Sequence, residues 1–199
     1  EISYFNMFGK KYQWATEQTG AVGRFDPSSL AEVLYQIHEN VELFEKAYGR
    51  FETLADSVRF YVNELFGSEG LIVIDGDDRQ LKVQFAPIMK DDILNQNAYQ
   101  RVKDTNEQLI DLGYKSQAFS RPINFFYLDD FRRRIISDGE NFSVLDSDIK
   151  FTKQEILSEI DHYPERFSPN VIMRPIYQEV ILPNIAYLGG PAEIIYWLQ

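Results

Sequence analysis

The segment Asp75-Gly76-Asp77-Asp78 has the residue types that bind amines, hydroxyls and hydrated cations. It follows an apolar run, so we expect it at the carboxyl end of a buried strand, where open α/β sheets bind ligands. There Asp75 would accept a hydrogen bond from an amine or a ribose, and Asp77 or Asp78 would hold Mg²⁺ through water. An acidic residue is also a common N-cap, so capping of the next helix is the competing interpretation.

The segment Gly189-Gly190-Pro191-Ala192-Glu193 joins two glycines to a proline that suits the first position of a helix. Free backbone amides at a helix start bind carboxylates and phosphates, so we predict that Gly189 and Gly190 contact an anion and that Glu193 contacts an amine or hydroxyl. The segment has neither the third glycine of a dinucleotide fingerprint nor the Lys-Ser/Thr of a P-loop. Tight packing of a strand against a helix is the competing role of the glycines.

A third polar set lies on a predicted helix that begins at Ser168. Asn170 falls in its first turn, and Arg174, Tyr177 and Gln178 share one side, because residues three or four apart face the same way. These side chains are therefore candidates to converge on a ligand.

Arg174 is followed by Pro175, and a proline inside a helix costs about 3 kcal/mol unless the backbone bends. We therefore expect this helix to bend. A purely structural ion pair of Arg174 with Glu179 or Glu193 is the alternative to a ligand contact.

Several other kinds of site are disfavoured by residue type. The chain has no cysteine, which excludes disulfides, cysteine-based metal sites and a cysteine nucleophile within it. The two histidines, His38 and His162, lack the spacing of zinc motifs, so we expect structural roles for both and no metal site. No GxSxG elbow indicates a serine hydrolase.

The charge of the chain limits its partners. Its formal net charge of −11 disfavours nucleic acids and acidic membranes. The only basic run, Arg132-Arg133-Arg134, falls in a predicted hairpin, where a solvated strand edge is the simplest interpretation and a local anion contact is the alternative. Because no signal peptide or membrane span is evident and cysteine is absent, we expect a cytoplasmic protein.

Helices are predicted from capping residues and apolar periodicity. Asp26-Pro27 starts the first, Thr152 and Glu155 form a capping box before another, and Pro87 is expected to bend or divide the longest. The predicted helices span residues 27–44, 51–66, 79–112, 152–163 and 168–183, and a further one begins at Pro191.

Strands are predicted in two different settings. The short apolar runs 71–75 and 185–188 do not alternate, which is typical of parallel strands buried on both faces. Three β-rich runs form a predicted antiparallel unit with a hairpin turn at Asp138-Gly139: residues 122–128, 133–137 and 142–145. Residues 1–25 are aromatic and glycine-punctuated, and we expect loop or short strands there.

This order of elements predicts an α/β fold in which an antiparallel unit is inserted into a parallel core. Two parallel strands cannot form a stable sheet alone, and the chain neither starts with methionine nor caps its last helix, so we expect a piece of a longer protein. Four segments are predicted: an aromatic loop with helical connecting segment (1–70), a core strand with a long helix (71–120), the inserted strands (121–150), and helices, strand and glycine junction (151–199).

Five blocks of the sequence resemble the bacillithiol biosynthesis cysteine-adding enzymes. They occur in the order of that family and extend over nearly the whole chain: QTGAVGR at 18–24, IDGDD at 74–78, PINFFYL at 122–128, FSPNVIMRPIYQE at 167–179 and NIAYLGGPAEIIYW at 184–197. The resemblance implies a Rossmann-like core similar to class I aminoacyl-tRNA synthetases, with inserted connecting segments. It also implies a homodimer formed through a coiled coil that lies outside this chain.

The resemblance further implies a ligase that joins the carboxyl group of L-cysteine to the amine of glucosaminyl malate. ATP is the expected cosubstrate, through an acyl adenylate, and this piece alone is not expected to be active. Under that function Gly189, Gly190 and Asn170 would position an anionic group, Arg174 would offset developing charge, and Asp75 or Glu193 would orient the amine. The remaining expected binding residues are Asp77, Asp78, Ser168 and Gln178.

Two other classes of function remain open at this level. One is a nucleotide- or sugar-binding α/β domain without catalysis, and the other is a structural interaction module. The first would keep the glycine junction but show no turnover, and the second would tolerate substitution at Gly190, Asn170 and Arg174 together.

Overall fold

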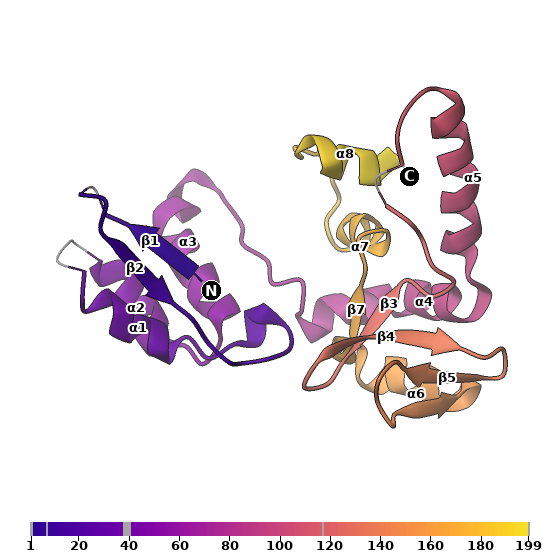
Figure 1. The fold of residues 1–199 in the computed structure, drawn as a ribbon, viewed down its shortest axis with the longest axis horizontal. Coiled ribbons are helices and arrows are strands. Elements are labelled where there is room, and N and C mark those ends of the chain that lie inside the picture. The colour runs from indigo at the N-terminus through magenta and orange to yellow at the C-terminus, as the bar shows by residue number, and fades with distance from the viewer. Residues whose placement is uncertain (1, 7, 38–40, 117, 199) are drawn as a thin grey trace. The chain divides into compact units, whose positions relative to one another are not determined.

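The computed structural model describes residues 2–6, 8–37, 41–116 and 118–198. The chain divides into two compact units, Glu1–Asp75 and Gly76–Gln199, shown in Figure 1. The predicted segments 121–150 and 151–199 both contribute strands to one sheet in the second unit.

The first unit packs three helices with a two-stranded hairpin. Its elements are β1 (Ile2–Phe5), β2 (Lys11–Trp14), the 3₁₀ turn η1 (Val22–Arg24), α1 (Ser28–Leu34), α2 (Glu42–Arg50), α3 (Leu54–Phe66) and η2 (Gly67–Glu69). Trp14, Leu30 and Leu54 form its buried centre, and the Trp14 indole donates to the hydroxyl of Ser29 at 2.9 Å. The short strands expected among residues 1–25 are therefore present.

The helix boundaries of the first unit differ from the prediction at two places. The single helix expected over 27–44 is instead α1 and α2, and residues 38–40, which include His38, lie outside the described residues. The next helix begins at Leu54 because Thr53 caps it, accepting from the backbone N–H of Asp56 at 3.1 Å.

The second unit contains one antiparallel sheet of five strands. The strands are β3 (Phe125–Leu128), β4 (Arg132–Ser137), β5 (Asn141–Val144), β6 (Lys150–Thr152) and β7 (Phe167–Pro169), in the spatial order β6-β5-β4-β3-β7. The helical elements are α4 (Arg79–Asn95), α5 (Asn97–Asp111), α6 (Lys153–His162), η3 (Pro164–Arg166), α7 (Met173–Ile181) and α8 (Pro191–Leu198). The predicted hairpin at Asp138-Gly139 and the capping box of α6 are confirmed.

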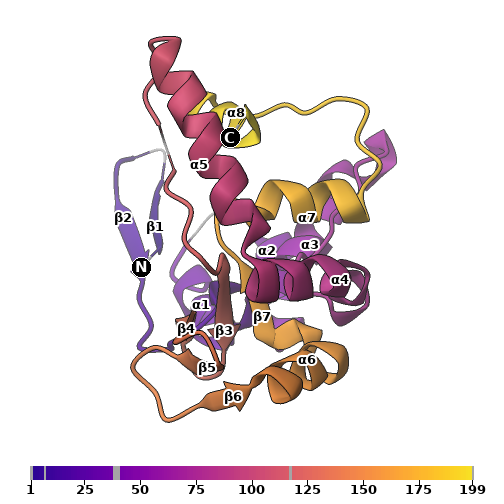
Figure 2. The same ribbon diagram turned by 90° about the vertical axis from the view of Figure 1, so that its right-hand side faces the viewer.

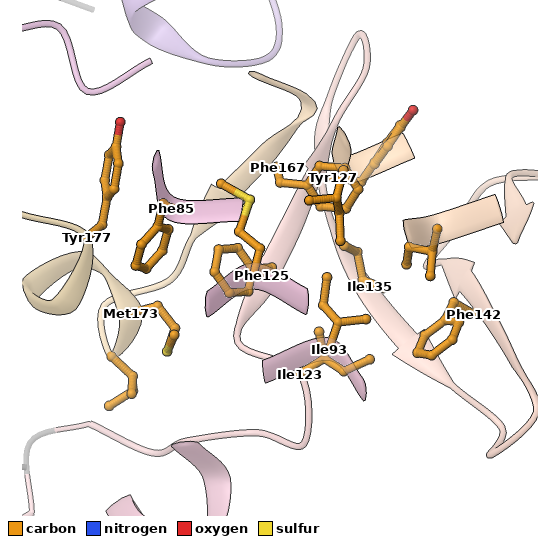
Figure 3. Packing of buried hydrophobic residues seen from close by; sticks show 14 of the residues in the cluster. Phe85, Ile93, Ile123, Phe125, Tyr127, Ile135, Phe142, Phe167, Met173 and Tyr177 are labelled. Carbon is orange, nitrogen blue, oxygen red and sulfur yellow. The ribbon is translucent and has the colours of Figure 1, made fainter. Parts of the chain in front are cut away.

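The core of the second unit lies between this sheet and its helices. Figure 2 shows α4 and α6 along one side of the strands. Phe85 and Ile93 of α4 and Ile156 of α6 pack there against Phe125 and Ile135 of the sheet, and Figure 3 shows most of this cluster. Aromatic rings account for much of it, as the composition predicts.

The prediction of parallel strands at 71–75 and 185–188 is wrong for the described residues. Neither segment forms a strand pair, and Ile72 is 81% exposed while Ile185 and Leu188 are fully exposed. Every strand pair that the described residues form is antiparallel. An apolar run becomes a strand only where a neighbouring strand satisfies its backbone hydrogen bonds, and no described segment does so here.

The long helical region predicted over 79–112 is divided at Gln96 rather than at Pro87. Gln96 has the left-handed φ of 56° and separates α4 from α5. Pro87 is exposed inside α4, whereas Phe85 and Met89 are fully buried. α4 therefore continues through the missing hydrogen bond of the proline, stabilised by packing of its buried face.

Candidate functional site

Four of the predicted site residues meet where α7 faces the start of α8. The Glu193 carboxylate takes one donor on each oxygen: Oε1 lies 3.5 Å from Nη2 of Arg174, and Oε2 accepts from the backbone N–H of Gly190 at 3.2 Å. Arg174 Nη1 also donates to Oε1 of Gln178, one turn along α7, at 3.5 Å. We call Arg174, Gln178, Gly190 and Glu193 the α7–α8 cluster.

Local structure explains why these groups point toward one another. Arg174 and Gln178 are four residues apart on α7, so their side chains share a face. Gly190 accepts the first backbone hydrogen bond of α8, from Ile194 at 3.0 Å, which places its own N–H at the helix start. Glu193 lies in the first turn of α8 and folds back onto that amide, as a carboxylate at a helix N-terminus does.

The α7–α8 cluster is open to solvent and loosely held. The Arg174 and Glu193 side chains are 40% and 48% exposed, and their contact distance of 3.5 Å is long for an ion pair. An exposed pair of this kind contributes only about 0–1 kcal/mol. The guanidinium and the amide are therefore able to exchange Glu193 for another anion at small cost.

The two glycines of this segment differ in the space available for a side chain. A Cβ on Gly189 would lie 2.5 Å from Cε1 of Tyr187, whereas a Cβ on Gly190 would meet only the Glu193 carboxylate, at 4.0 Å. The ring of Tyr187 in turn contacts the ring of Trp197 of α8 at a centroid distance of 4.6 Å, tilted by 36°. A side chain at 189 would therefore require the Tyr187 ring to shift, and the role predicted for Gly190 depends on its amide rather than on its lack of a side chain.

The acidic segment at the start of α4 is tied into the structure of the second unit. The Asp78 carboxylate accepts from the backbone N–H of Gln80 at 2.7 Å, so the capping interpretation of Asp78 is confirmed. Asp77 pairs with Lys82, a lysine only 2% exposed that also donates to the carbonyl of Glu165 at 3.1 Å. No sequence pattern predicted this buried lysine, because its spacing from Asp77 matches no motif.

Asp75 and the segment after it fall in different units. Asp75 is the last residue of the first unit, so its role toward the second-unit groups stays a prediction. Gly76 belongs to the second unit, where its carbonyl accepts from the hydroxyl of Tyr177 at 2.9 Å. Tyr177, which shares α7 with Arg174, is therefore occupied in holding the start of α4.

Asn170 is engaged by backbone and side-chain partners on all sides. Its Oδ1 accepts from the N–H groups of Ile172 and Met173, at the start of α7, at 2.9 and 3.1 Å. Its Nδ2 donates to Oδ1 of Asn124 at 2.9 Å, and its backbone N–H donates to the Asn124 carbonyl at the same distance. Asn170 thus has a structural role in this conformation, and its predicted contact with an anion stays a prediction.

A buried polar network continues from Asn170 through Asn124 to Asp92. The Asp92 carboxylate accepts from the backbone N–H and from Nδ2 of Asn124 at 2.7 and 3.2 Å. Burial raises the pKa of Asp92, and the two hydrogen bonds from Asn124 oppose that rise. Sequence patterns did not reveal this network, since its members are separated by more than 30 positions.

Ser168 also lies in a structural contact. It belongs to β7, where it pairs with Phe126, and this is why α7 begins at Met173 rather than at Ser168. The Ser168 hydroxyl accepts from Nε of Arg132 at 3.1 Å, and the Arg132 guanidinium lies 3.7 Å over the Phe126 ring. A ligand contact of Ser168 stays a prediction.

Among the described residues, no three or more histidine, aspartate or glutamate side chains gather in a way that could hold a metal ion. His162 contacts the backbone carbonyl of Ser158 through Nδ1 at 2.8 Å, one turn back in α6. Within the same described ranges, every helix is too short or too polar to cross a membrane.

Comparison with known proteins identifies the family of this chain. Residues 1–199 match the family described as "Bacillithiol biosynthesis BshC, N-terminal Rossmann-like domain". Relatives named "Putative cysteine ligase BshC" from Cytophaga hutchinsonii and Flavobacterium johnsoniae are each 46% identical over the whole chain, which spans 38% and 39% of their lengths. A relative of the same name from Shouchella clausii is 36% identical over 73% of the chain, which covers 28% of that relative. The chain therefore belongs to the BshC family of bacillithiol biosynthesis, within its N-terminal Rossmann-like domain.

Proposed function

We propose that the protein to which this chain belongs is a ligase that joins the carboxyl group of L-cysteine to the amine of glucosaminyl malate. The observation that carries this proposal is the family match over all 199 residues, together with the cysteine ligase names of relatives at 46% identity. The chain spans less than half of those relatives, so the activity is proposed for the whole protein and not for this piece.

The α7–α8 cluster is the best candidate to hold an anionic part of a substrate. Arg174 and the Gly190 amide already converge on a carboxylate, that of Glu193, which stands in for the carboxylate or phosphate of a ligand. A phosphate of ATP fits the same donor set, because a guanidinium and a helix N-terminus both favour negative charge. Glu193 would then be released to accept a hydrogen bond from an amine.

The proposed chemistry proceeds in two steps. The cysteine carboxylate attacks the α-phosphorus of ATP, and pyrophosphate leaves, which gives an acyl adenylate. The amine of glucosaminyl malate then attacks the acyl carbon, AMP leaves, and a carboxylate such as Glu193 or Asp75 takes the proton of the amine. In this scheme Arg174 stabilises negative charge that develops on the transferred group.

The full-length protein is expected to complete the fold around this chain. We propose that the full-length protein includes a parallel core similar to class I aminoacyl-tRNA synthetases. The exposed apolar side chains of Ile72, Ile185 and Leu188 support further packing partners there. A dimer through a coiled coil and a cytoplasmic location belong to the same proposal.

Product formation by the full-length protein tests the function. Purified protein is supplied with L-cysteine, glucosaminyl malate and ATP, and bacillithiol, AMP and pyrophosphate are measured. We expect all three products in equal amounts. ADP and phosphate in place of AMP would refute the adenylate route, and nucleotide binding without any bacillithiol would favour the non-catalytic binding domain.

Two arginine variants test the placement of the site. Arg174→Gln removes the cation of the α7–α8 cluster, and we expect a loss of kcat/KM of about 100-fold, since one such electrostatic donor contributes about 2.7–4 kcal/mol. Arg133→Gln is the matched control, because Arg133 also pairs with a carboxylate, Asp129, at 3.5 Å. Equal activity of the two variants would place the site elsewhere.

A further inference from the structure

A second cluster of cationic groups lies at the far end of α4. A pocket of about 200 Å³ opens between the end of this helix, the loop before β3 and the strand β4. Gln96, Arg121, Arg134 and Ser137 supply its polar side chains, and it is completed by Pro122, Ile123, Ile135 and Ile136. None of these residues belongs to the α7–α8 cluster.

The two arginines of this pocket are unpaired. Among the residues that the structure describes, neither the Arg121 nor the Arg134 guanidinium forms an ion pair or a hydrogen bond. The neighbours of Arg134 in the basic run behave differently: Arg132 donates to Ser168 and Pro169, and Arg133 pairs with Asp129. In a chain of net charge −11, two arginines without a carboxylate partner at one pocket favour an external anion.

The backbone that carries these arginines is firmly anchored. The Arg121 N–H donates to Oδ1 of Asn124 at 3.0 Å, and its carbonyl accepts from Nδ2 of the same residue at 2.8 Å. Asn124 is in turn held by the buried Asp92, whose carbonyl accepts the N–H of Gln96 at 3.0 Å. The buried network therefore fixes two of the three segments around the pocket.

Arg134 is fixed by the sheet. It lies in β4, between β3 and β5, opposite Phe126, and its carbonyl accepts from the N–H of Leu145 at 2.9 Å. Because both arginines extend from rigid backbone, little ordering is needed before a ligand binds.

The composition of the pocket limits the chemistry of the ligand. Guanidinium groups bind carboxylates and phosphates through paired N–H donors. The Ser137 hydroxyl is engaged with the Asn141 carbonyl at 3.0 Å, so the arginines and the Gln96 amide remain as the polar groups for a ligand. The exposed lining residues Pro122 and Ile136 are apolar, which favours a ligand with a short hydrocarbon body over a bare inorganic anion.

We propose that this pocket binds a short dicarboxylate, with one carboxylate on Arg121 and the other on Arg134. The volume of about 200 Å³ is large enough for a four-carbon dicarboxylate. The proposal does not rest on the ligase function, because it concerns binding at a separate place and needs neither cysteine nor ATP.

Titration calorimetry of the full-length protein with succinate tests the proposal. Arg121→Gln and Arg134→Gln should each weaken succinate binding by about tenfold or more, because each removes a charged bidentate contact worth at least about 1.4 kcal/mol. Arg101→Gln is the control: it changes the net charge equally but lies on α5, outside this pocket. Its succinate affinity should stay within about twofold of the wild type.

Each alternative outcome overturns a defined part of the proposal. No binding of succinate to the wild type, or equal binding by all three variants, would show that the pocket is not the site. Inorganic phosphate that binds as tightly as succinate, with the same loss in both variants, would refute the dicarboxylate assignment. Both variants replace exposed or half-buried side chains, and their thermal unfolding curves show whether each remains folded.

Discussion

Replacement of Asn124 by alanine should destabilise the second unit strongly, although asparagine is a small polar residue. Its buried carboxamide makes four hydrogen bonds: Oδ1 accepts from Arg121 and Asn170, and Nδ2 donates to Asp92 and to the Arg121 carbonyl. Each of these partners is held in place by the fold, so no neighbouring side chain can rotate to replace the hydrogen bonds that the Asn124 carboxamide makes.

The magnitude follows from which partners can reach water. Arg121 is exposed, so its backbone groups can form hydrogen bonds with water in the variant, and the loss of their hydrogen bonds to Asn124 costs little. The bond to the charged Asp92 contributes about 1.5–3 kcal/mol and the neutral bond to Asn170 about 1 kcal/mol, for a total of about 3 kcal/mol. At 1.4 kcal/mol for each factor of ten, backbone amides around β3 should exchange about 100-fold faster with deuterium.

Hydrogen–deuterium exchange of the full-length protein, read by mass spectrometry, measures this change in peptides that contain β3. Asn141→Ala provides the control, because Asn141 is an exposed strand residue whose hydrogen bonds are made by its backbone. An exchange rate in Asn124→Ala equal to that of the control would refute the account of the buried network. Faster exchange in second-unit peptides that include β3, with first-unit peptides unchanged, would support it.

Three further outcomes are expected from the same structure. Gly189→Ala should lower the thermal unfolding midpoint more than Gly190→Ala, since a Cβ at 189 would lie 2.5 Å from the ring of Tyr187 and one at 190 meets nothing closer than 4.0 Å; the reverse order would contradict the packing. Tyr127→Phe should lower the free energy of unfolding, measured by urea denaturation, by about 1 kcal/mol, because the 2.6 Å hydrogen bond to Glu159 is lost. Burial raises the pKa of Tyr127 from 10.0 to about 12, so the stability that the tyrosine contributes should be lost as pH rises through that interval. Burial raises the pKa of Asp92 above 3.8, so the folded state binds a proton at this carboxyl more tightly than the unfolded state does. The free energy of unfolding of the wild type should therefore exceed that of Asp92→Asn by less as pH rises above that value. An excess that grows with pH would contradict the raised pKa.

Local signals in the sequence predicted local structure well. The capping box of Thr152 and Glu155 and the hairpin at Asp138-Gly139 are both present, because each depends on residues at most a few positions apart. The cap by Asp78 is of the same kind. Such features need no partner from elsewhere in the chain.

Strand pairing and the buried network could not be predicted in that way. The apolar run 185–188 has strand-like composition, yet it is exposed and unpaired, since pairing depends on whether another strand is available beside it. Lys82 and Asn124 were missed because their partners lie far away in sequence, at Glu165, 83 positions on, and at Asp92, 32 positions back. The helix break was predicted at Pro87 from residue propensity, but the helix continues through Pro87 and ends at Gln96, because packing outweighs propensity there.

The sequence by itself determined the family, because blocks such as IDGDD at 74–78 and the glycine junction at 189–193 are characteristic in composition and order. Only the tertiary structure decided which of the candidate residues meet. In it, Arg174 and the Gly190 amide contact the carboxylate of Glu193, whereas Asn170 forms part of the buried network with Asn124. The physical reason is that residue type fixes what a group can bind, whereas the distance between groups depends on how helices and strands far apart in the chain pack together.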